Sequence, residues 1–250
     1  MKEVPGSTLT VETVAYHTAG EPFRIVTAGV EPLRGRTILD KRRYALQHLD
    51  HIRELLVYEP RGHADMYGCF PTEPEDAGAQ LGVVFFHNAG YSTACGHGTI
   101  ALVTWAIAEA RILAVEPQTQ VVVDVPSGRL KTVATVEHGR VRSVTFQNVP
   151  SFVLIDDLPL RIGPRSVKVA VAYGGAFYAI LPSEAFEIPV EPAYLPRLIE
   201  LGREIKAKVE AAKEVVHPLR AALRAIAGLI VTNGNRNVTI IADGEVASYA

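Results

Sequence analysis

Short stretches of alternating or continuous apolar residues predict strands in the first half of the chain. Residues 9–16 (LTVETVAY) alternate between polar and apolar, which is typical of an edge strand. Phe23–Val26, residues 65–70 and residues 81–88 are short apolar runs rich in strand-forming residues. Residues 120–150 continue this pattern, with glycines marking the turns. The pattern therefore predicts a sheet of several strands in the first half of the chain.

Apolar residues recur at three- and four-residue spacing in two other stretches, which predicts amphipathic helices. The first helix runs from Asp40, which can cap its start, to Pro60, which stops it. The second lies within residues 191–216. Their apolar faces consist of Tyr44, Leu49, Ile52, Leu55 and Leu56 in the first, and Leu198, Ile199, Ile205, Val209 and Ala212 in the second.

Residues 97–110 predict a helix of a different kind. From Thr99 to Ala108 the chain is apolar on nearly every face, which is typical of a helix buried all round. The stretch is too short to cross a membrane. Cys95 comes just before it, so we expect this cysteine at the start of a helix that runs through a core.

The pattern begins again near Pro150. Residues 151–162 and 165–181 predict strands, and residues 229–246 predict a hairpin because they contain an Asn-Gly turn. The fold class is therefore α/β (α+β), with two similar domains. We expect residues 1–150 to form the first domain and residues 151–250 to form a second, incomplete one.

Composition narrows the possible functions. The chain has 250 residues, of which 48% are hydrophobic, and a formal net charge of -2. A basic excess that would indicate nucleic acid is absent, and no apolar run approaches a membrane span. The first residues (MKEVPGSTLTVE) lack the apolar core of a secretory signal. We therefore expect a cytoplasmic protein that binds neither nucleic acid nor membrane.

Cys95 lies in the stretch YSTACGHGT, residues 91–99, and has the features of a reactive thiol. Unpaired amides at a helix start favour a thiolate, whereas a free cysteine has a pKa of about 8.5. Gly96 and Gly98 let another molecule approach the backbone, and the same amides would bind a carboxylate. The alternative is a small structural cysteine at a tight strand-to-helix junction.

Other chemistry at this position has less support. Cys95 and His97 are two residues apart, but no second cluster completes four metal ligands, so we expect no metal. A Cys-His nucleophile pair is possible, although nothing in the sequence directs His97 toward the sulfur. Cys69 lies in an apolar strand and is expected to be structural, with a raised pKa and slower alkylation than Cys95. His17 and His63 stand in turn-like stretches, where they could form walls of a site but are more often polar loop residues.

Four segments together resemble the proline racemase-like family: HTAGEPFRIV (17–26), EPRGHADMYG (59–68), HNAGYSTACGHGTIAL (87–102) and YGGAFYAI (173–180). Within that family, KRRYALQHLDHIR and EPRGHADMYG most resemble the trans-3-hydroxy-L-proline dehydratases. The resemblance implies a diaminopimelate epimerase-like fold, in which two domains of curved mixed sheet each wrap a central helix around an active-site cleft. It also implies a homodimer that uses no cofactor or metal. By the same resemblance, Cys95 is the catalytic cysteine, and the backbone of Gly96 and His97 helps to hold the substrate carboxylate.

The chain departs from the family pattern in three places. The family continues after a strand like VTIIADGEV with Asp-Arg-Ser-Pro, then Cys or Thr, whereas here Val246 is followed by ASYA. Ala94 stands where the family usually has Met, and Tyr16 where an acidic or other residue often precedes His-Thr. We therefore expect a truncated, frameshifted or partial member of the family with an incomplete second domain.

The resemblance leads to one main hypothesis and two alternatives. The main one is cofactor-independent dehydration of trans-3-hydroxy-L-proline, in which the Cys95 thiolate removes the α-proton. The first alternative is a proline racemase or 4-hydroxyproline epimerase, which needs two opposed bases. The second is a non-catalytic family member whose exposed apolar concavity invites partners or aggregation.

Overall fold

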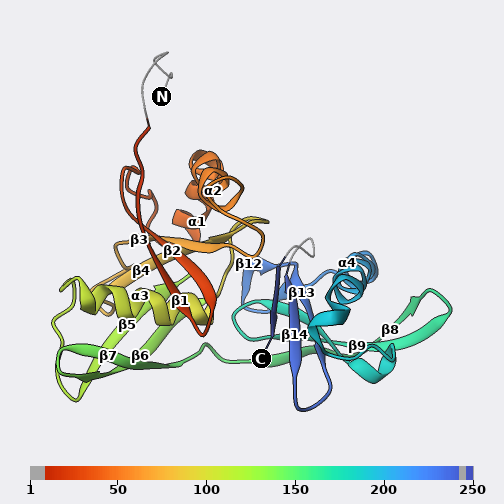
Figure 1. Ribbon diagram of the computed structural model, residues 1–250. Helices are drawn as coiled ribbons and strands as arrows, with labels where there is room; N and C mark the ends of the chain where they lie inside the picture. Colours follow the sequence, from red (N-terminus) through yellow and green to blue (C-terminus); the bar gives the residue numbers. More distant parts are fainter. Residues whose placement is uncertain (1–8, 242–245, 250) are drawn as a thin grey trace.

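The computed structural model describes residues 9–241 and 246–249, and Figure 1 shows the chain as two groups of strands side by side. A seven-stranded sheet in the order β1-β2-β3-β4-β5-β6-β7 forms what we call the first unit, and a six-stranded sheet in the order β15-β14-β13-β10-β9-β8 forms the second unit. The strands of the first unit are β1 (Glu12–Thr18), β2 (Glu21–Ala28), β3 (Tyr67–Thr72), β4 (Leu81–His87), β5 (Gln118–Val125), β6 (Gly128–Glu137) and β7 (Arg140–Gln147).

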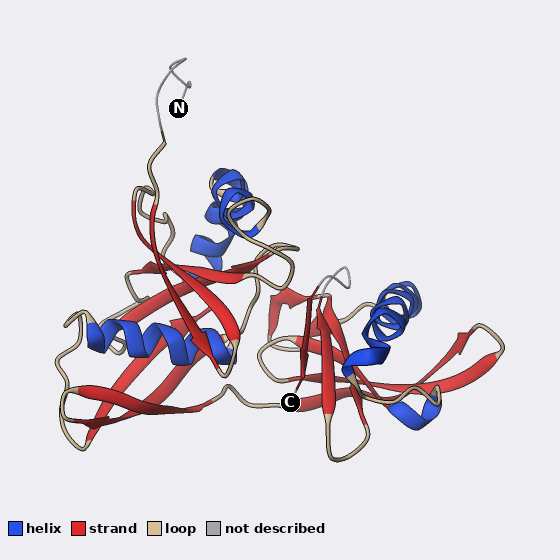
Figure 2. Ribbon diagram, viewed as in Figure 1, coloured by secondary structure: helices blue, strands red, loops and turns tan. Residues whose placement is uncertain are grey.

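The first unit is a mixed sheet wrapped around a central helix. The β2–β3 and β4–β5 pairs are parallel, and the other neighbouring strands are antiparallel. Helix α3 (Gly96–Ala108) contacts both edge strands, β1 and β7, so the sheet must curve around it. Figure 2 shows this helix framed by strands. Its side chains are buried on almost every side, which confirms the predicted buried helix.

Two shorter helices cover the outer face of the same sheet. The sequence predicts one helix from Asp40 to Pro60, whereas the structure has α1 (Ile38–His48) and α2 (Asp50–Val57), separated by Leu49. The cap is also different: Thr37 caps α1, and Asp40 is the third helical residue, which completes a capping box. Leu49 is buried in the core of this face although its backbone is not helical. Its apolar side chain therefore continues the pattern across the break between the two helices.

The second unit carries its helix on one face of the sheet. Helix α4 (Leu195–Ala212) packs there through an apolar stripe that includes Leu198, Ile205 and Val209. It ends before the predicted residue 216, because a hairpin that the sequence did not predict begins there. The remaining elements are β8 (Phe152–Ile162), β9 (Arg165–Tyr173), β10 (Phe177–Pro182), β13 (Ile226–Thr232), β14 (Asn237–Ile241) and β15 (Val246–Tyr249), the hairpin strands β11 (Val216–His217) and β12 (Arg220–Arg224), and the 3₁₀ turns η1 (Ser183–Ala185) and η2 (Pro192–Tyr194).

The other face of the second sheet points away from α4. Strand side chains alternate between faces, and Phe177, Ala179 and Leu181 belong to the core under α4. Tyr178 and Ile180 therefore lie on the opposite face. Among the described residues, α4 is the α-helix of the second unit, and it leaves that face without a helix.

The turns agree with the glycine signals in the sequence. His138 and Gly139 link β6 to β7 with φ angles of 52° and 72°. The predicted hairpin at residues 229–246 is confirmed for β13 and β14, whose turn contains Gly234 with a φ of 85°. Residues 242–245 of that prediction lie outside the described residues. The predicted mixed α/β fold is confirmed.

Candidate active site

A cavity of about 230 Å³ lies between the two units and contains Cys95. The first unit supplies one wall and the second unit supplies the other, so residues from distant parts of the sequence meet there. The residues that line the cavity are Glu21, Tyr67, Ala94, Cys95, Gly96, His97, Thr99, Leu130, Phe146 and Asn148, together with Gly174, Ala176, Tyr178 and Thr239 of the second unit. The three predicted site residues Cys95, Gly96 and His97 therefore lie together in one cavity.

Cys95 is the residue at which helix α3 begins. Its backbone is extended, with φ and ψ of -155° and 107°, and its carbonyl accepts the first helical hydrogen bond, from the Thr99 N–H at 3.0 Å. The Thr99 hydroxyl donates to the same carbonyl at 2.8 Å. The side chain of Cys95 makes no capping hydrogen bond, and the residue lines the cavity. The predicted position of Cys95 at the start of a buried helix is confirmed.

The expected lowering of the Cys95 pKa is wrong. Burial raises the pKa of this thiol to about 12, because only 8% of the residue is exposed. The Gly98 N–H opposes this shift by stabilising the thiolate, and a nearby Glu21 adds to it. The helix-start effect is thus present, but the loss of solvation outweighs it.

Gly98 is required by its neighbours. A Cβ at this position would lie 2.4 Å from the Phe23 ring and 2.8 Å from Cys95 Sγ, which no side chain could tolerate without a shift. A Cβ at Gly96 would lie 3.4 Å from Phe146, which is an ordinary contact. Gly98 therefore lets the sulfur and an aromatic ring pack against the first turn of α3.

His97 is closer to the sulfur than the sequence indicated. Its Nδ1 and Nε2 lie 3.6 and 3.7 Å from Cys95 Sγ, so the sulfur is almost equally far from both ring nitrogens. Burial lowers the pKa of His97 to about 4, so the ring is neutral near pH 7. The ring also packs edge-on against Phe23 and Tyr67, with centroid distances of 5.7 and 4.9 Å. His97 is therefore a neutral neighbour of the thiol and not a cation that could lower its pKa.

Two arginines from the outer helices hold the loop that leads to Cys95. Arg53, in α2, donates from Nη1 to the carbonyls of His87 and Asn88 at 3.1 and 2.6 Å. Arg42, in α1, donates to the Tyr91 carbonyl from Nε at 3.0 Å and from Nη2 at 2.5 Å. These side chains fix the backbone just before Ser92–Ala94. Sequence reasoning missed them, although both lie in the segment KRRYALQHLDHIR.

The second unit is hydrogen-bonded to this loop and to the segment that follows β7. The Thr93 hydroxyl donates to the Gly175 carbonyl at 2.6 Å, and the Asn148 amide donates to the Gly174 carbonyl at 2.9 Å. Gly175 has a φ of 103°, and a Cβ there would lie 2.7 Å from the Cβ of Ala94. A close backbone approach of the two units therefore forms the cavity beside Cys95.

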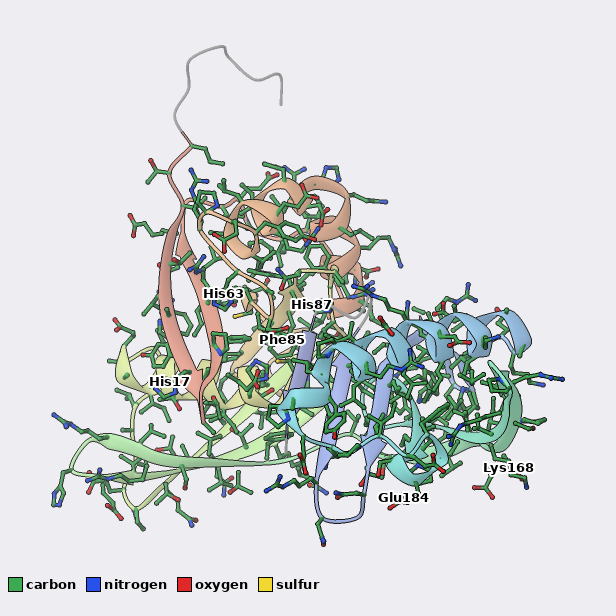
Figure 3. The ribbon with its side chains drawn as sticks, turned by 45° about the vertical axis from the view of Figure 1, so that its right-hand side comes forward. His17, His63, Phe85, His87, Lys168 and Glu184 are labelled. Carbon is green, nitrogen blue, oxygen red and sulfur yellow. The ribbon has the colours of Figure 1, made fainter. Side chains whose placement is uncertain are left out.

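The residues that were expected to be structural or polar lie elsewhere. Cys69 is fully buried in β3, and burial raises its pKa well above the usual value. Figure 3 shows His17 and His63 on separate parts of the first unit. Both are exposed: the Nδ1 of His17 accepts the Gly20 N–H, and the His63 ring contacts the carbonyl of Ala64. Neither lines the cavity.

Two tyrosines in the cavity were not identified from the sequence. Tyr67 belongs to β3 and Tyr178 to β10, and each lies in a segment that carries the family resemblance.

The described residues contain no cluster of three or more His, Cys, Asp or Glu side chains that could hold a metal ion. A search of the described part of the chain also finds no helix long and apolar enough to cross a membrane.

Comparisons with known proteins agree with this arrangement. The proline racemase family model matches residues 13–246. The chain is 43% identical over 241 residues to a trans-3-hydroxy-L-proline dehydratase of Bacillus cereus, with 94% of this chain and 72% of the relative covered. It is 41% identical over 244 residues to a 3-hydroxyproline 2-epimerase of Burkholderia multivorans, with 94% and 73% covered.

A solved structure is also similar across both units. It is a hydroxyproline epimerase from Agrobacterium vitis with bound trans-4-hydroxy-L-proline, at a TM-score of 0.87 and 25% identity, with 94% of this chain and 71% of that chain covered. Since the family model matches most of the sequence and the curved sheet around α3 is shared with this structure, the chain belongs to the proline racemase family.

Proposed function

We propose that this protein dehydrates trans-3-hydroxy-L-proline, with Cys95 as the base that removes the α-proton. The observation that carries this proposal is the Cys95 thiol at the start of α3, inside a cavity between the two units. The relatives named as trans-3-hydroxy-L-proline dehydratases, at 40–43% identity, support the choice of substrate.

The start of α3 supplies a binding site for the substrate carboxylate. The first amides of a helix have no partner within the helix, and they carry a partial positive charge. The backbone N–H groups of Gly96 and His97 are the first two of α3, and both residues line the cavity. We assign these amides to the carboxylate, which places the α-carbon beside Cys95.

Substrate binding also favours the thiolate. Burial raises the pKa of Cys95 to about 12, so the sulfur is protonated near pH 7 without a ligand. The ring nitrogen of a proline-type substrate is a cation, and a cation near a thiol lowers the pKa of that thiol. Abstraction of the α-proton and loss of the 3-hydroxyl then give an enamine, which tautomerises to pyrroline-2-carboxylate. This acid–base chemistry requires no cofactor.

The alternative within the family is racemisation or epimerisation, and relatives named as epimerases give it support. Inversion requires a second acid on the opposite side of the α-carbon. Among the described residues, Cys95 is the thiol in the cavity, because Cys69 is buried in the core of β3. Dehydration is the main proposal because relatives at 43% identity are named trans-3-hydroxy-L-proline dehydratases, and the experiment below separates the two reactions.

We also propose that the two sheets are two domains divided near residue 150, and that the chain forms a homodimer. The strands change from one sheet to the other between Gln147 and Phe152, which supports the division. Analytical ultracentrifugation tests the dimer: a sedimentation coefficient for 27.1 kDa would contradict it.

The function is tested by incubating the purified protein with trans-3-hydroxy-L-proline in deuterated water. We expect pyrroline-2-carboxylate from the parent chain and none from Cys95→Ser, with Cys69→Ser as the matched control that retains activity. α-Deuterated product of inverted configuration from L-proline would favour the racemase. No product and no exchange would favour a non-catalytic protein.

A further inference from the structure

Tyr178 reaches the active-site cavity from the second unit. It lies in β10 between Phe177 and Ala179, which point into the core beneath α4. Because strand side chains alternate, the Tyr178 ring points to the opposite face of this sheet, where it lines the cavity that holds Cys95.

The neighbours of Tyr178 leave room for its ring. Its partner in β9 is Ala172 and its partner in β13 is Gly228, so the residues beside it are among the smallest available. The ring is partly exposed to the cavity, while Tyr67 is 4% exposed and packs against the rings of His87 and His97. Tyr178 is therefore the phenol that is freer to meet a ligand.

The proposed reaction needs a proton donor as well as a base. A hydroxyl is a poor leaving group until it receives a proton, so the 3-hydroxyl needs a general acid. In trans-3-hydroxy-L-proline the carboxylate and the hydroxyl are on opposite faces of the ring. The α-hydrogen is opposite the carboxylate, so it shares a face with the hydroxyl. The donor must therefore lie on the same side of the substrate as Cys95.

We propose that Tyr178 is the general acid that protonates the departing 3-hydroxyl, and that its presence in the same cavity as Cys95 selects the trans isomer. This inference rests on the proposed dehydration. The two groups line one cavity of about 230 Å³, so a ring bound at the start of α3 meets the sulfur and the phenol together.

Electrostatics supports this geometry. Burial raises the pKa of Tyr178 to about 12, and a charge on Cys95 adds to that shift, so the phenol keeps its proton near pH 7 and lies within electrostatic reach of the sulfur. Burial raises the pKa of Cys95 to a similar value, about 12. His97, the other polar ring beside the sulfur, has a pKa lowered to about 4 by burial and holds no extra proton to donate.

The step balances as follows. The Cys95 thiolate forms an S–H bond with the α-hydrogen, and the electron pair of the broken C–H bond becomes the double bond of the enamine. The C–O bond at carbon 3 breaks, and the Tyr178 proton moves to the departing oxygen, which leaves as water. The new thiol then returns its proton to the Tyr178 phenolate. The net change is loss of water from the substrate.

Tyr178→Phe tests the assignment because it removes the phenol oxygen and keeps the ring. We expect water elimination from trans-3-hydroxy-L-proline to fall by on the order of 100-fold or more, as for loss of a general acid. Exchange of the α-hydrogen of L-proline with deuterated water should persist, because L-proline has no hydroxyl to expel. A variant that was simply misfolded would lose both reactions.

Tyr173→Phe is the matched control. Tyr173 is in the neighbouring strand and its side chain is buried. Its hydroxyl has no hydrogen-bond partner among the described residues, so its loss should leave both reactions unchanged. Comparison with cis-3-hydroxy-L-proline adds a second measurement, in which the parent chain should eliminate water only from the trans isomer.

Two results would overturn the assignment. One is a Tyr178→Phe variant that eliminates water at the parent rate, and the other is equal elimination from the cis and trans isomers. A parent chain that exchanges the α-hydrogen of L-proline but eliminates no water would instead refute the proposed dehydration, and the role of Tyr178 with it.

Discussion

At the scale of single residues, the two cysteines differ in access more than in acidity. Burial raises the pKa of both thiols, but Cys95 lines a cavity whereas Cys69 is 0% exposed in β3. We expect iodoacetamide to label Cys95 first, at a rate that still increases between pH 8 and pH 10, since the thiolate population grows up to a pKa of about 12. Peptide mapping by mass spectrometry measures both rates. Faster labelling of Cys69 would contradict the site.

Two histidines whose pKa values are lowered by burial make the fold sensitive to acid. Burial lowers the pKa of His87 and of His97 to about 4, while an unfolded histidine titrates near roughly 6.5. Between these values the unfolded chain binds more protons, so stability should fall as the pH drops from 6.5 toward 4, by about 1.4 kcal/mol per pH unit for each histidine.

Urea unfolding at several pH values tests this expectation. His87→Asn should reduce the loss of unfolding free energy between pH 6.5 and pH 4, because it removes one of the two histidines that take up a proton on unfolding. His51 is exposed, so His51→Gln serves as the control and should leave this pH dependence unchanged. A stability that does not change between pH 6.5 and 4 would show that these rings are not held neutral.

The sequence predicts which residues lie together at the start of α3 better than it predicts their pKa values. Cys95, Gly96 and His97 follow one another at a recognisable helix start, so pattern and resemblance identify them together. The sign of the Cys95 pKa shift depends on how much of the second unit covers the sulfur, which no local pattern reports. Tyr178 was missed for the same reason, because only the packing of two sheets brings it to Cys95.

At the scale of elements, α1 and α2 brace the loop that leads to Cys95. Arg53 is 5% exposed and binds Asp50 through two nitrogens as well as two loop carbonyls. We expect Arg53→Ala to lower the free energy of unfolding by about 2–4 kcal/mol, because it removes the hydrogen bonds of Arg53 to the His87 and Asn88 carbonyls and its ion pair with Asp50. Urea unfolding monitored by circular dichroism measures the loss.

A nearby arginine provides the control for this prediction. Arg43 forms an exposed pair with Asp40 on the same helix, so Arg43→Ala should cost less than about 1 kcal/mol. Arg53→Lys should fall in between, because it keeps the charge but loses the planar fork. Equal losses for Arg43→Ala and Arg53→Ala would contradict the brace.

Element prediction succeeds where periodicity and burial agree. Helix α3 is apolar on all sides and central, and the β6–β7 and β13–β14 hairpins have glycine turns. It fails at Leu49. The buried side chain of this residue has the spacing of a continuous helix, but its backbone is not helical and separates α1 from α2. It also fails at β11–β12, because the strands are too short for a pattern.

At the scale of the whole molecule, the proposed carboxylate site lies at the start of α3, in the first unit. The chain spans 72% of the length of its Bacillus cereus relative. We expect a chain extended with the C-terminal segment of that relative to show a kcat/KM higher by on the order of 100-fold or more. The family resemblance implies that this segment adds an Asp and a second helix start to the site, and charge-assisted contacts of this kind contribute about 1.5–3 kcal/mol each. It should also unfold at a higher temperature. Equal kcat/KM for the two lengths would show that the first 250 residues suffice.

At position 95, the residue that best stabilises the start of α3 differs from the residue that the proposed activity needs. Cysteine caps a helix poorly, and the Cys95 side chain makes no capping hydrogen bond. Serine is among the best residues at this position. Cys95→Ser should therefore melt at a higher temperature than the parent, by an amount that corresponds to roughly 0.5–1 kcal/mol, while losing its activity. Selection for a thermostable variant alone would thus favour an inactive protein at this position.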